Sequence, residues 1–148
     1  MKIEKLLKIM KDLRDPDKGC PWDRKQTMES IIPHSIEEVY EVAEQIYNKD
    51  YVKLKEELGD LLFQVVYLSQ LAEEKDKFNF YDVVHSISSK MILRHPHVFK
   101  NKKFKNMKDF KLWWEKSKNK EKNSILDNIP FTYPAYLEAN KIQKKVAS

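Results

Sequence analysis

The chain has 148 residues, which is near the commonest size of a single domain and long enough to bury most of a core without disulfide bonds. Its single cysteine excludes an intrachain disulfide, and no apolar run approaches the length of about twenty residues that a membrane-spanning helix needs. Only two glycines occur, which argues against phosphate-binding loops of the P-loop or dinucleotide type. We therefore expect one cytoplasmic domain.

The formal net charge of +5 is unevenly distributed. Residues 37–60 contain eight acidic and three basic residues, whereas residues 90–122 contain twelve basic and three acidic ones. The two segments therefore suit different partners. The basic excess is almost entirely lysine. The basic residues at 90–122 therefore have two equally good explanations, a lysine-rich composition of the whole chain or a binding surface.

Apolar residues at helical spacing predict a first helix over residues 3–13, and the turn residues at 14–21 predict a loop. Thr27 is expected to cap a short turn. A longer helix is expected to begin after Pro33 and to end at Asn48.

Asp50 is expected to cap a third helix that runs to Glu74. Asn79 is expected to cap a fourth helix, from Tyr81 to about Arg94. The proline that follows this segment predicts that the helix ends there.

Asn106 is expected to open a further helix, which fades into a charged run. Residues 124–134 are expected to be irregular, and residues 135–147 to form a last helix. The prediction is an all-α fold, a helical bundle.

Two acidic steps lie on the second and third predicted helices: Glu38 with Glu41, and Glu57 with Asp60. Residues three apart share a helix face, so two antiparallel helices would aim four carboxylates at one point. Such a concentration of negative charge is tolerated mainly around a cation, and all-oxygen ligands suit Mg²⁺, with Mn²⁺ as the alternative. The paired Glu-x-x-His steps of di-iron bundles are absent from the sequence.

The two acidic steps differ in their surroundings. Glu38 borders the apolar arc of its helix and Glu41 lies almost opposite that arc, as in an ordinary solvated face. The third helix is apolar nearly all round from Leu61 onward, which is typical of a helix surrounded by protein. Its acidic step is therefore expected at the mouth of a buried segment, where it needs a lysine, a hydrogen-bond network or a metal.

Gly59 lies inside the second acidic step. A glycine within a helix costs about 1 kcal/mol relative to alanine and is usually kept because another group approaches closely. Tight helix packing and a functional group explain it equally well.

Other side chains leave two interpretations open. Trp22 is able to stack on a planar ligand, but a tryptophan in such a loop is as often a plug over the core. Lys90 and Arg94 lie four residues apart on one predicted helix, where they face either an anion or solvent. The His95-Pro96-His97 segment is expected to satisfy backbone groups at a helix end instead of binding a metal.

The chain resembles the MazG nucleoside triphosphate pyrophosphohydrolases in four motifs, which occur in order over about residues 19–120. These motifs are Cys20-Pro21-Trp22-Asp23, Glu37-Glu38-Val39-Tyr40-Glu41, Glu57-Leu58-Gly59-Asp60-Leu61-Leu62 and Arg94-His95-Pro96-His97-Val98-Phe99. The resemblance implies an all-α domain whose bundle is completed by dimerisation. It further implies Mg²⁺-dependent hydrolysis of a nucleoside triphosphate to the monophosphate and pyrophosphate, in control of the nucleotide pool.

The resemblance also implies roles for single residues. The metal ligands of the family match four acids, Glu38, Glu41, Glu57 and Asp60. Lys90 and Arg94 match a basic pair attributed to phosphate contact, and Trp114 resembles the family's late tryptophan. Glu37 matches a further acid that supports the site or activates water. We group Trp22 with the substrate-binding residues.

We expect the MazG-like domain to occupy residues 1–122, and residues 123–148 to form a linker and a helix. Longer family members carry a second, similar domain, and residues 139–147 resemble the segment that leads into it. The chain is therefore either a fragment of a two-domain protein or a short form.

Two other functions remain open from the residues alone. A helical binding module would dock its basic 90–122 segment on nucleic acid or an acidic protein, with steep salt dependence. A structural dimerisation unit with a decayed site would show no stabilisation by metal. We expect a nucleoside triphosphate as the substrate, a second copy as the partner, and neither membrane nor nucleic acid.

Overall fold

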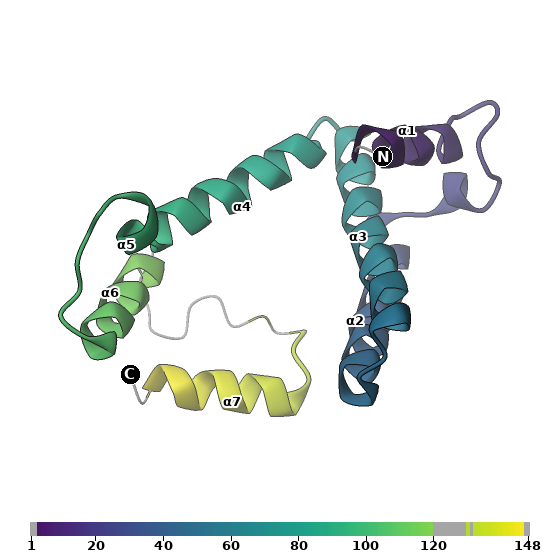
Figure 1. The fold of residues 1–148 in the computed structure, drawn as a ribbon. Helices are drawn as coiled ribbons and strands as arrows, with labels where there is room; N and C mark the ends of the chain where they lie inside the picture. Colours follow the sequence, from purple (N-terminus) through teal and green to yellow (C-terminus); the bar gives the residue numbers. More distant parts are fainter. Residues whose placement is uncertain (1–2, 120–129, 131, 147–148) are drawn as a thin grey trace. The chain divides into compact units, whose positions relative to one another are not determined.

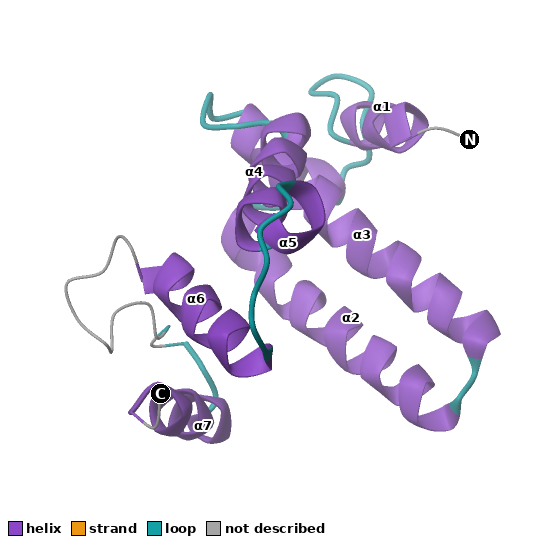
Figure 2. Ribbon diagram, turned by 60° about the vertical axis from the view of Figure 1, so that its left-hand side comes forward, coloured by secondary structure: helices purple, strands orange, loops and turns teal. Residues whose placement is uncertain are grey.

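The computed structural model of the chain describes residues 3–119, 130 and 132–146. The described secondary structure is entirely helical, as the sequence predicts (Figure 1, Figure 2). In chain order the elements are α1 (Ile3–Leu13), the 3₁₀ turn η1 (Asp23–Lys25), α2 (Met28–Asn48), α3 (Tyr51–Glu73), α4 (Phe80–Arg94), α5 (Pro96–Phe99), α6 (Met107–Asn119) and α7 (Ala135–Val146). None of these helices combines the length and the apolar character that crossing a bilayer requires.

The chain divides into two compact units, one up to Ser89 and one from Lys90, so that the boundary falls within α4. The domain end that the sequence predicts at residue 122 lies outside the described residues, and it stays a prediction.

The start of α2 differs from the prediction, because the helix begins at Met28 and continues through Pro33. The hydroxyl of Thr27 accepts a hydrogen bond from the backbone N–H of Ser30 at 3.3 Å, and the Ser30 hydroxyl accepts one from the backbone of Thr27 at 2.9 Å. This capping box satisfies donors that a helix start otherwise leaves unpaired. It anchors the first turn firmly enough for Pro33, which removes one backbone donor, to be accommodated.

Other predicted helix starts are confirmed by their caps. The side chain of Asp50 accepts hydrogen bonds from two backbone amides of the first turn of α3, each at 3.1 Å. Asn79 does the same for α4, at 2.8 and 3.2 Å, and Asn106 accepts one bond in the first turn of α6, at 3.0 Å. The last helix begins at Ala135, as the sequence predicts.

In the first unit, α2 and α3 form an antiparallel hairpin, whose two helices lie side by side in Figure 2. The connection is tight because Lys49 adopts the left-handed conformation, with a φ of 56°, and Asp50 then caps α3. Antiparallel pairing places the beginning of α2 beside the end of α3. The buried core forms at that end, where α1 packs on α3, from Met10, Ile31, Val66, Tyr67 and Leu71.

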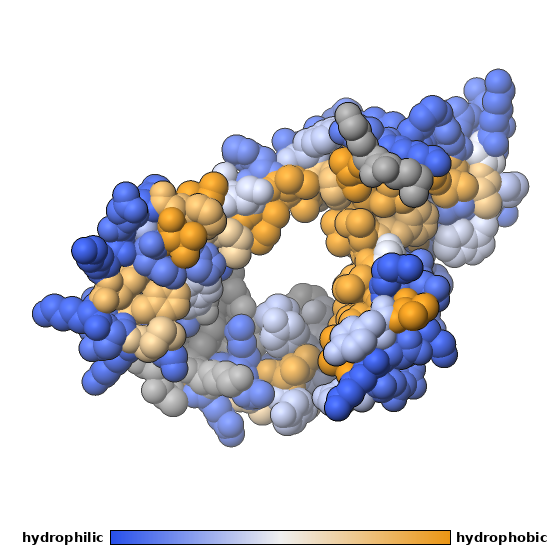
Figure 3. Space-filling view, viewed as in Figure 1, coloured by the Kyte–Doolittle hydropathy of each residue, from blue (hydrophilic) through white to orange (hydrophobic). Residues whose placement is uncertain are grey.

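Along the middle of the hairpin, large apolar side chains remain exposed, and Figure 3 shows apolar surface along one edge of the hairpin. On α3 the exposed fractions of Leu58, Leu62 and Val65 are 49%, 41% and 38%. The prediction that protein surrounds α3 from Leu61 onward is therefore wrong for Leu62 and Val65 in the single chain, and it is confirmed from Val66, which is buried in the core. The reason is geometric: α2 and α1 cover only part of the circumference of α3. On α2, the apolar residues left exposed include Ile36, Val39 and Tyr40.

The second unit contains a cluster of aromatic rings in edge-to-face contact. His95 packs on Trp114 with ring centroids 4.9 Å apart, and His97 packs on Phe110 at 4.8 Å. The Nδ1 atom of His95 also lies 2.8 Å from the carbonyl oxygen of Met91, at the end of α4. The prediction that this segment satisfies backbone groups at a helix end is thus confirmed.

Candidate metal centre

Three carboxylates meet at the middle of the α2–α3 hairpin. Glu38 and Glu41 come from neighbouring turns of α2, and Glu57 comes from the facing side of α3. One oxygen atom from each of these three residues lies within 4.8 Å of the other two. The spacing of three residues on α2 and the antiparallel pairing of α3 produce this cluster, which contains three of the four acids that the sequence predicts to converge.

Loss of hydration and then the neighbouring negative charges raise the pKa values of two acids of this cluster. Loss of hydration raises the pKa of Glu38 first; a hydrogen bond from Gln64 opposes this, and the charges of Asp60 and Glu41 raise the pKa further. Loss of hydration also raises the pKa of Glu57, followed by the charges of Glu41 and Asp60. Both carboxylates therefore lie where negative charge is disfavoured, which a bound cation would relieve.

The donor atoms of the cluster fit a hard divalent ion. All three candidate ligand atoms are carboxylate oxygens, which Mg²⁺ and Mn²⁺ prefer. Beside them, the Gln64 amide nitrogen donates to Glu38 at 3.3 Å, while its Oε1 atom is buried and has no hydrogen-bond partner among the described residues. A water molecule held by a metal ion would supply that missing donor.

Two predicted acids lie at the edge of the cluster. Asp60 is exposed and is not one of the three residues whose oxygens converge, although its charge acts on both Glu38 and Glu57. The expected difference in burial, with the α3 acids enclosed and the α2 acids at the surface, is wrong. Glu38 and Glu57 are both half-buried, because the hairpin leaves that side of α3 open. Glu37 is outside the cluster and faces His34, whose Nδ1 atom lies 3.9 Å from the nearer carboxylate oxygen.

The loop between α1 and α2 is held in place by buried backbone contacts. The hydroxyl of Tyr67 donates to the carbonyl oxygen of Asp23 at 3.0 Å, and the guanidinium of Arg14 donates to the same oxygen. Gly19 passes so close to the backbone of Leu13 and Asp15 that a Cβ atom there would overlap it. The loop is therefore rigidly fixed to α1 and α3.

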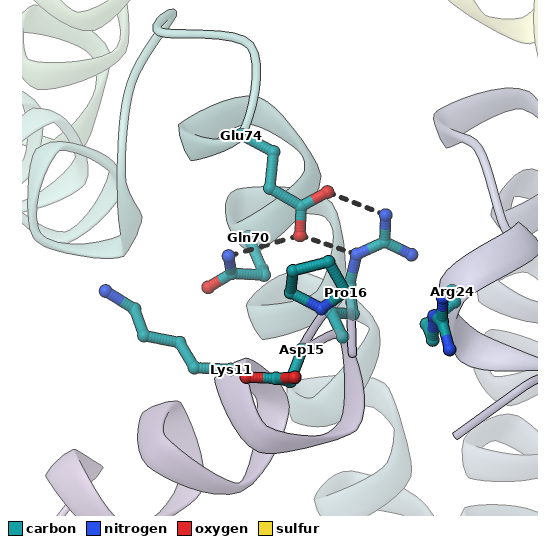
Figure 4. Close-up of a pocket in the computed structure, with 7 residues that line it drawn as sticks. Lys11, Asp15, Pro16, Arg24, Gln70 and Glu74 are labelled. Atoms are coloured by element: carbon teal, nitrogen blue, oxygen red, sulfur yellow. Dashed lines mark hydrogen bonds and ion pairs between the residues drawn. The ribbon is translucent and has the colours of Figure 1, made fainter. Parts of the chain in front are cut away.

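A cavity of about 540 Å³ lies at the end of α3 away from the carboxylates (Figure 4). Two guanidinium nitrogens of Arg14 each donate to a carboxylate oxygen of Glu74 at 2.6 Å across it. Lys11 also lines the cavity, and it pairs with Glu73 at 2.9 Å. Both cations are already paired with acids of α3 or its C-cap. These ion pairs therefore hold α1 and the residue after it against α3.

Three further predicted site residues belong to the second unit, namely Lys90, Arg94 and Trp114. Lys90 is exposed and Arg94 is half-buried, one turn apart near the end of α4, as the sequence predicts. The guanidinium of Arg94 lies over the ring of Trp114, 5.9 Å from its centroid. This contact orients Arg94 and gives it an attractive cation–π partner.

Residues 26–99 match the MazG nucleotide pyrophosphohydrolase domain. The chain belongs to the MazG family. The resemblance inferred from the four motifs is confirmed, and the matched region contains α2, α3, α4 and all four predicted metal ligands.

Two curated MazG relatives are similar over almost the whole chain. The Escherichia coli (strain K12) protein named nucleoside triphosphate pyrophosphohydrolase is 46% identical over 151 residues, which are 99% of this chain and 57% of that protein. The Thermotoga maritima protein named nucleoside triphosphate pyrophosphohydrolase/pyrophosphatase MazG is 43% identical over 148 residues, 98% of this chain and 56% of that protein. The chain thus spans a little over half the length of these relatives.

A solved structure supports the MazG fold. The crystal structure of a mazG-related protein from Thermotoga maritima aligns with a TM-score of 0.64 and 26% sequence identity. The alignment covers 78% of this chain and 98% of that chain.

The MazG motifs do not predict three contacts in the first unit, two of them beside the carboxylate cluster and one at the junction of α1 with α3. The orphaned amide oxygen of Gln64 was detectable only as a polar residue on the same helix stripe as Glu57 and Asp60. The ion pair of Arg14 with Glu74 joins residues sixty apart in the sequence, so no local sequence pattern predicts it. The position of His34, one turn before Glu38, was visible in the sequence, but the packing of its ring beside Trp22 of the loop, with centroids 5.9 Å apart, was not.

Proposed function

We propose that this chain hydrolyses nucleoside triphosphates to nucleoside monophosphates and pyrophosphate in the presence of a divalent metal ion, with Mg²⁺ as the first choice. The observation that carries the proposal is the convergence of Glu38, Glu41 and Glu57 within 4.8 Å. The names of the Escherichia coli and Thermotoga maritima relatives support the same activity.

The proposed roles of the acids follow from their positions. Glu38, Glu41 and Glu57 would hold the cation, and Asp60, whose charge acts on two of them, would complete the set. A bound divalent ion supplies charge neutralisation for the phosphates and lowers the pKa of a water molecule. Glu37 is exposed, next to Glu38 in the chain, and is proposed to support the site or to accept a proton from the attacking water.

In the overall reaction, one water molecule forms a bond to phosphorus while the anhydride bond between the α- and β-phosphates breaks. Lys90 and Arg94 are proposed to bind the phosphates, as the resemblance implies, and Trp114 holds the Arg94 guanidinium by its ring. Trp22 and Trp114 are proposed as substrate-binding side chains.

We also propose that the working unit is a homodimer formed through the apolar face of the hairpin. This face includes Ile36, Val39, Leu58, Leu62 and Val65, all of which the single chain leaves exposed. Several large apolar side chains exposed on one hairpin are typical of an interface, and a second copy packed there would also complete the enclosure of the carboxylates. The proposed setting is the cytoplasm, because the single cysteine gives no sign of disulfide use.

The test of activity is a panel of ribo-, deoxyribo- and modified nucleoside triphosphates with Mg²⁺, in which monophosphate and pyrophosphate are quantified separately. Glu57→Gln removes one convergent charge and should abolish turnover with the helical content intact. Glu44→Gln removes an exposed acid of the same hairpin that lies outside the cluster, and it should keep full activity. Equal turnover in both variants would refute this site.

The dimer is tested by sedimentation of the wild type and of Leu62→Lys. The lysine would place a charge in the proposed interface, so the variant should sediment as a monomer. The binding-module alternative predicts a different result, which is steeply salt-dependent association with nucleic acid and no nucleotide turnover.

A further inference from the structure

Trp22 presents a large exposed ring from a loop that does not move freely. Its side chain is 52% exposed, although its backbone is fixed by neighbours. The carbonyl oxygen of Trp22 accepts a hydrogen bond from the Gln26 side chain at 3.0 Å, and the next residue, Asp23, is bound by Tyr67 and Arg14. An exposed indole on a rigid support loses little conformational freedom when a ligand packs against it.

The exposed indole is not isolated, because the imidazole of His34 stands beside it. The two ring centroids are 5.9 Å apart and the ring planes are inclined at 69°. The His34 side chain is itself 44% exposed. Together the rings form a corner with one broad aromatic face and one polar edge, open to solvent.

This corner lies in line with the carboxylate cluster. His34, Glu38 and Glu41 are spaced by four and three residues on α2, so they share one stripe of the helix. With a rise of about 1.5 Å per residue, Glu38 is about 6 Å and Glu41 about 10 Å along the helix axis from His34. An aromatic corner at one end and anionic metal ligands at the other match a ligand with a planar ring at one end and phosphates at the other.

We propose that Trp22 and His34 form the nucleobase subsite, with the base stacked on the indole and its polar edge at the imidazole. This inference rests on the proposed nucleotide hydrolysis and specifies how the base is recognised. Any base offers a π-face to the indole, so stacking supplies affinity without choosing a base. The neutral imidazole has one donor and one acceptor nitrogen, and these distinguish the hydrogen-bonding edges of different bases.

The test compares nucleotides with a ligand that has no base. For wild type and variants, kcat and KM are measured with four ribonucleoside triphosphates, and the inhibition constant is measured for inorganic tripolyphosphate. Trp22→Ala should lower kcat/KM for all four nucleotides by between about 5-fold and about 100-fold, the range expected for loss of base stacking. The tripolyphosphate inhibition constant should stay within about twofold of the wild-type value, since phosphate and metal contacts are untouched.

Two further variants separate stacking from folding. Trp22→Phe keeps an aromatic face and should recover most of the lost kcat/KM. His34→Phe keeps a ring but removes both nitrogens, so it should change the ratio of kcat/KM values between bases several-fold and leave tripolyphosphate inhibition unchanged. The matched control is Tyr81→Ala, which removes a ring of similar exposure, 56%, that also packs edge-on against an aromatic neighbour. It should match the wild type.

The outcomes distinguish this inference from the proposed function. If Glu57→Gln abolishes turnover but Trp22→Ala behaves like Tyr81→Ala, the base subsite is wrong and the hydrolysis stands. An equal loss of nucleotide turnover and tripolyphosphate inhibition in Trp22→Ala would also overturn the subsite. If the wild type hydrolyses no nucleotide, the proposed function fails, and calorimetric binding of nucleoside monophosphates to wild type and Trp22→Ala decides the subsite alone.

Discussion

The side-chain amide of Gln64 donates a hydrogen bond to the carboxylate of Glu38 at 3.3 Å, across the interface between α3 and α2. The bond holds Glu38, a candidate metal ligand, in position, although Gln64 is not itself a candidate ligand. The bond also gives a hydrogen-bond partner to Gln64, a polar residue between the apolar residues Phe63 and Val65 of α3. Residues that orient metal ligands in this way influence metal binding without touching the metal.

Replacing Gln64 should therefore weaken metal binding more than it weakens the fold. We expect Gln64→Leu to reduce Mg²⁺ affinity by about tenfold or more, the usual effect of losing such a partner. The measurement is the Mg²⁺ concentration at half-maximal thermal stabilisation. Gln70→Leu is the matched control, because it removes an amide of the same helix that bonds to Glu74 at 3.2 Å, away from the carboxylates. Similar Mg²⁺ midpoints for the two variants would contradict the positioning role.

The raised pKa values of Glu38 and Glu57 predict how stability depends on pH in the absence of metal. Both carboxyl pKa values lie above the usual 4.5 in the folded chain, so between pH 4.5 and the raised values the folded state binds more protons than the unfolded state. Stability therefore falls as pH rises through that window. In EDTA, Glu57→Gln should equal the wild type in Tm below pH 4.5 and exceed it at pH 7.

Adding Mg²⁺ should reverse the order at pH 7, because the ion stabilises the ionised carboxylates of the wild type. The Tm gain on adding Mg²⁺ should be larger at pH 7 than at pH 4.5, and smaller in Glu57→Gln. A wild type that is more stable than Glu57→Gln in EDTA at pH 7 would mean that the cluster is already neutralised by another group of the protein.

The ion pair between Arg14 and Glu74 predicts the opposite pH dependence. The hydrogen bond from Arg14 holds the pKa of Glu74 below 4.5, so the pair stabilises the fold above that pH, and the contribution is lost as pH falls through the lowered pKa. At pH 7 we expect Glu74→Gln to reduce the free energy of unfolding by about 1 to 2 kcal/mol, since the bond is charge-assisted and bidentate.

The control for this ion pair is Asp12→Asn, which breaks the pair with Lys8. Both of its side chains are largely exposed, at 73% and 64%, so the loss should be close to zero. Chemical denaturation over a pH series that falls from 7 through the lowered pKa of Glu74 measures both differences. A Glu74→Gln deficit that stays constant until the protein unfolds in acid would show that packing, and not charge, is lost.

Sequence patterns specify the helices of this chain more completely than its site. Asp50, Asn79 and Asn106 cap their helices as predicted because a cap acts within three residues. The α2 start differs because the reciprocal bonds of Thr27 and Ser30 outweigh the signal from Pro33. The exposure of Asp60 and the pairing of Trp22 with His34 depend on which faces the hairpin leaves open. The local spacing of residues along one helix does not predict which faces of the hairpin stay exposed.

The two glycines of the chain should respond in opposite directions to the same substitution. At Gly59 an added Cβ would meet nothing within 4 Å, so Gly59→Ala should raise the free energy of unfolding by about 1 kcal/mol through helix propensity. At Gly19 an added Cβ would overlap the backbone of Leu13 and Asp15, so Gly19→Ala must displace the loop and should lower stability. Urea denaturation of the two variants at one protein concentration measures both effects. A loss of stability in Gly59→Ala would show that another group packs on that glycine, and the partner copy in the proposed dimer would be that group.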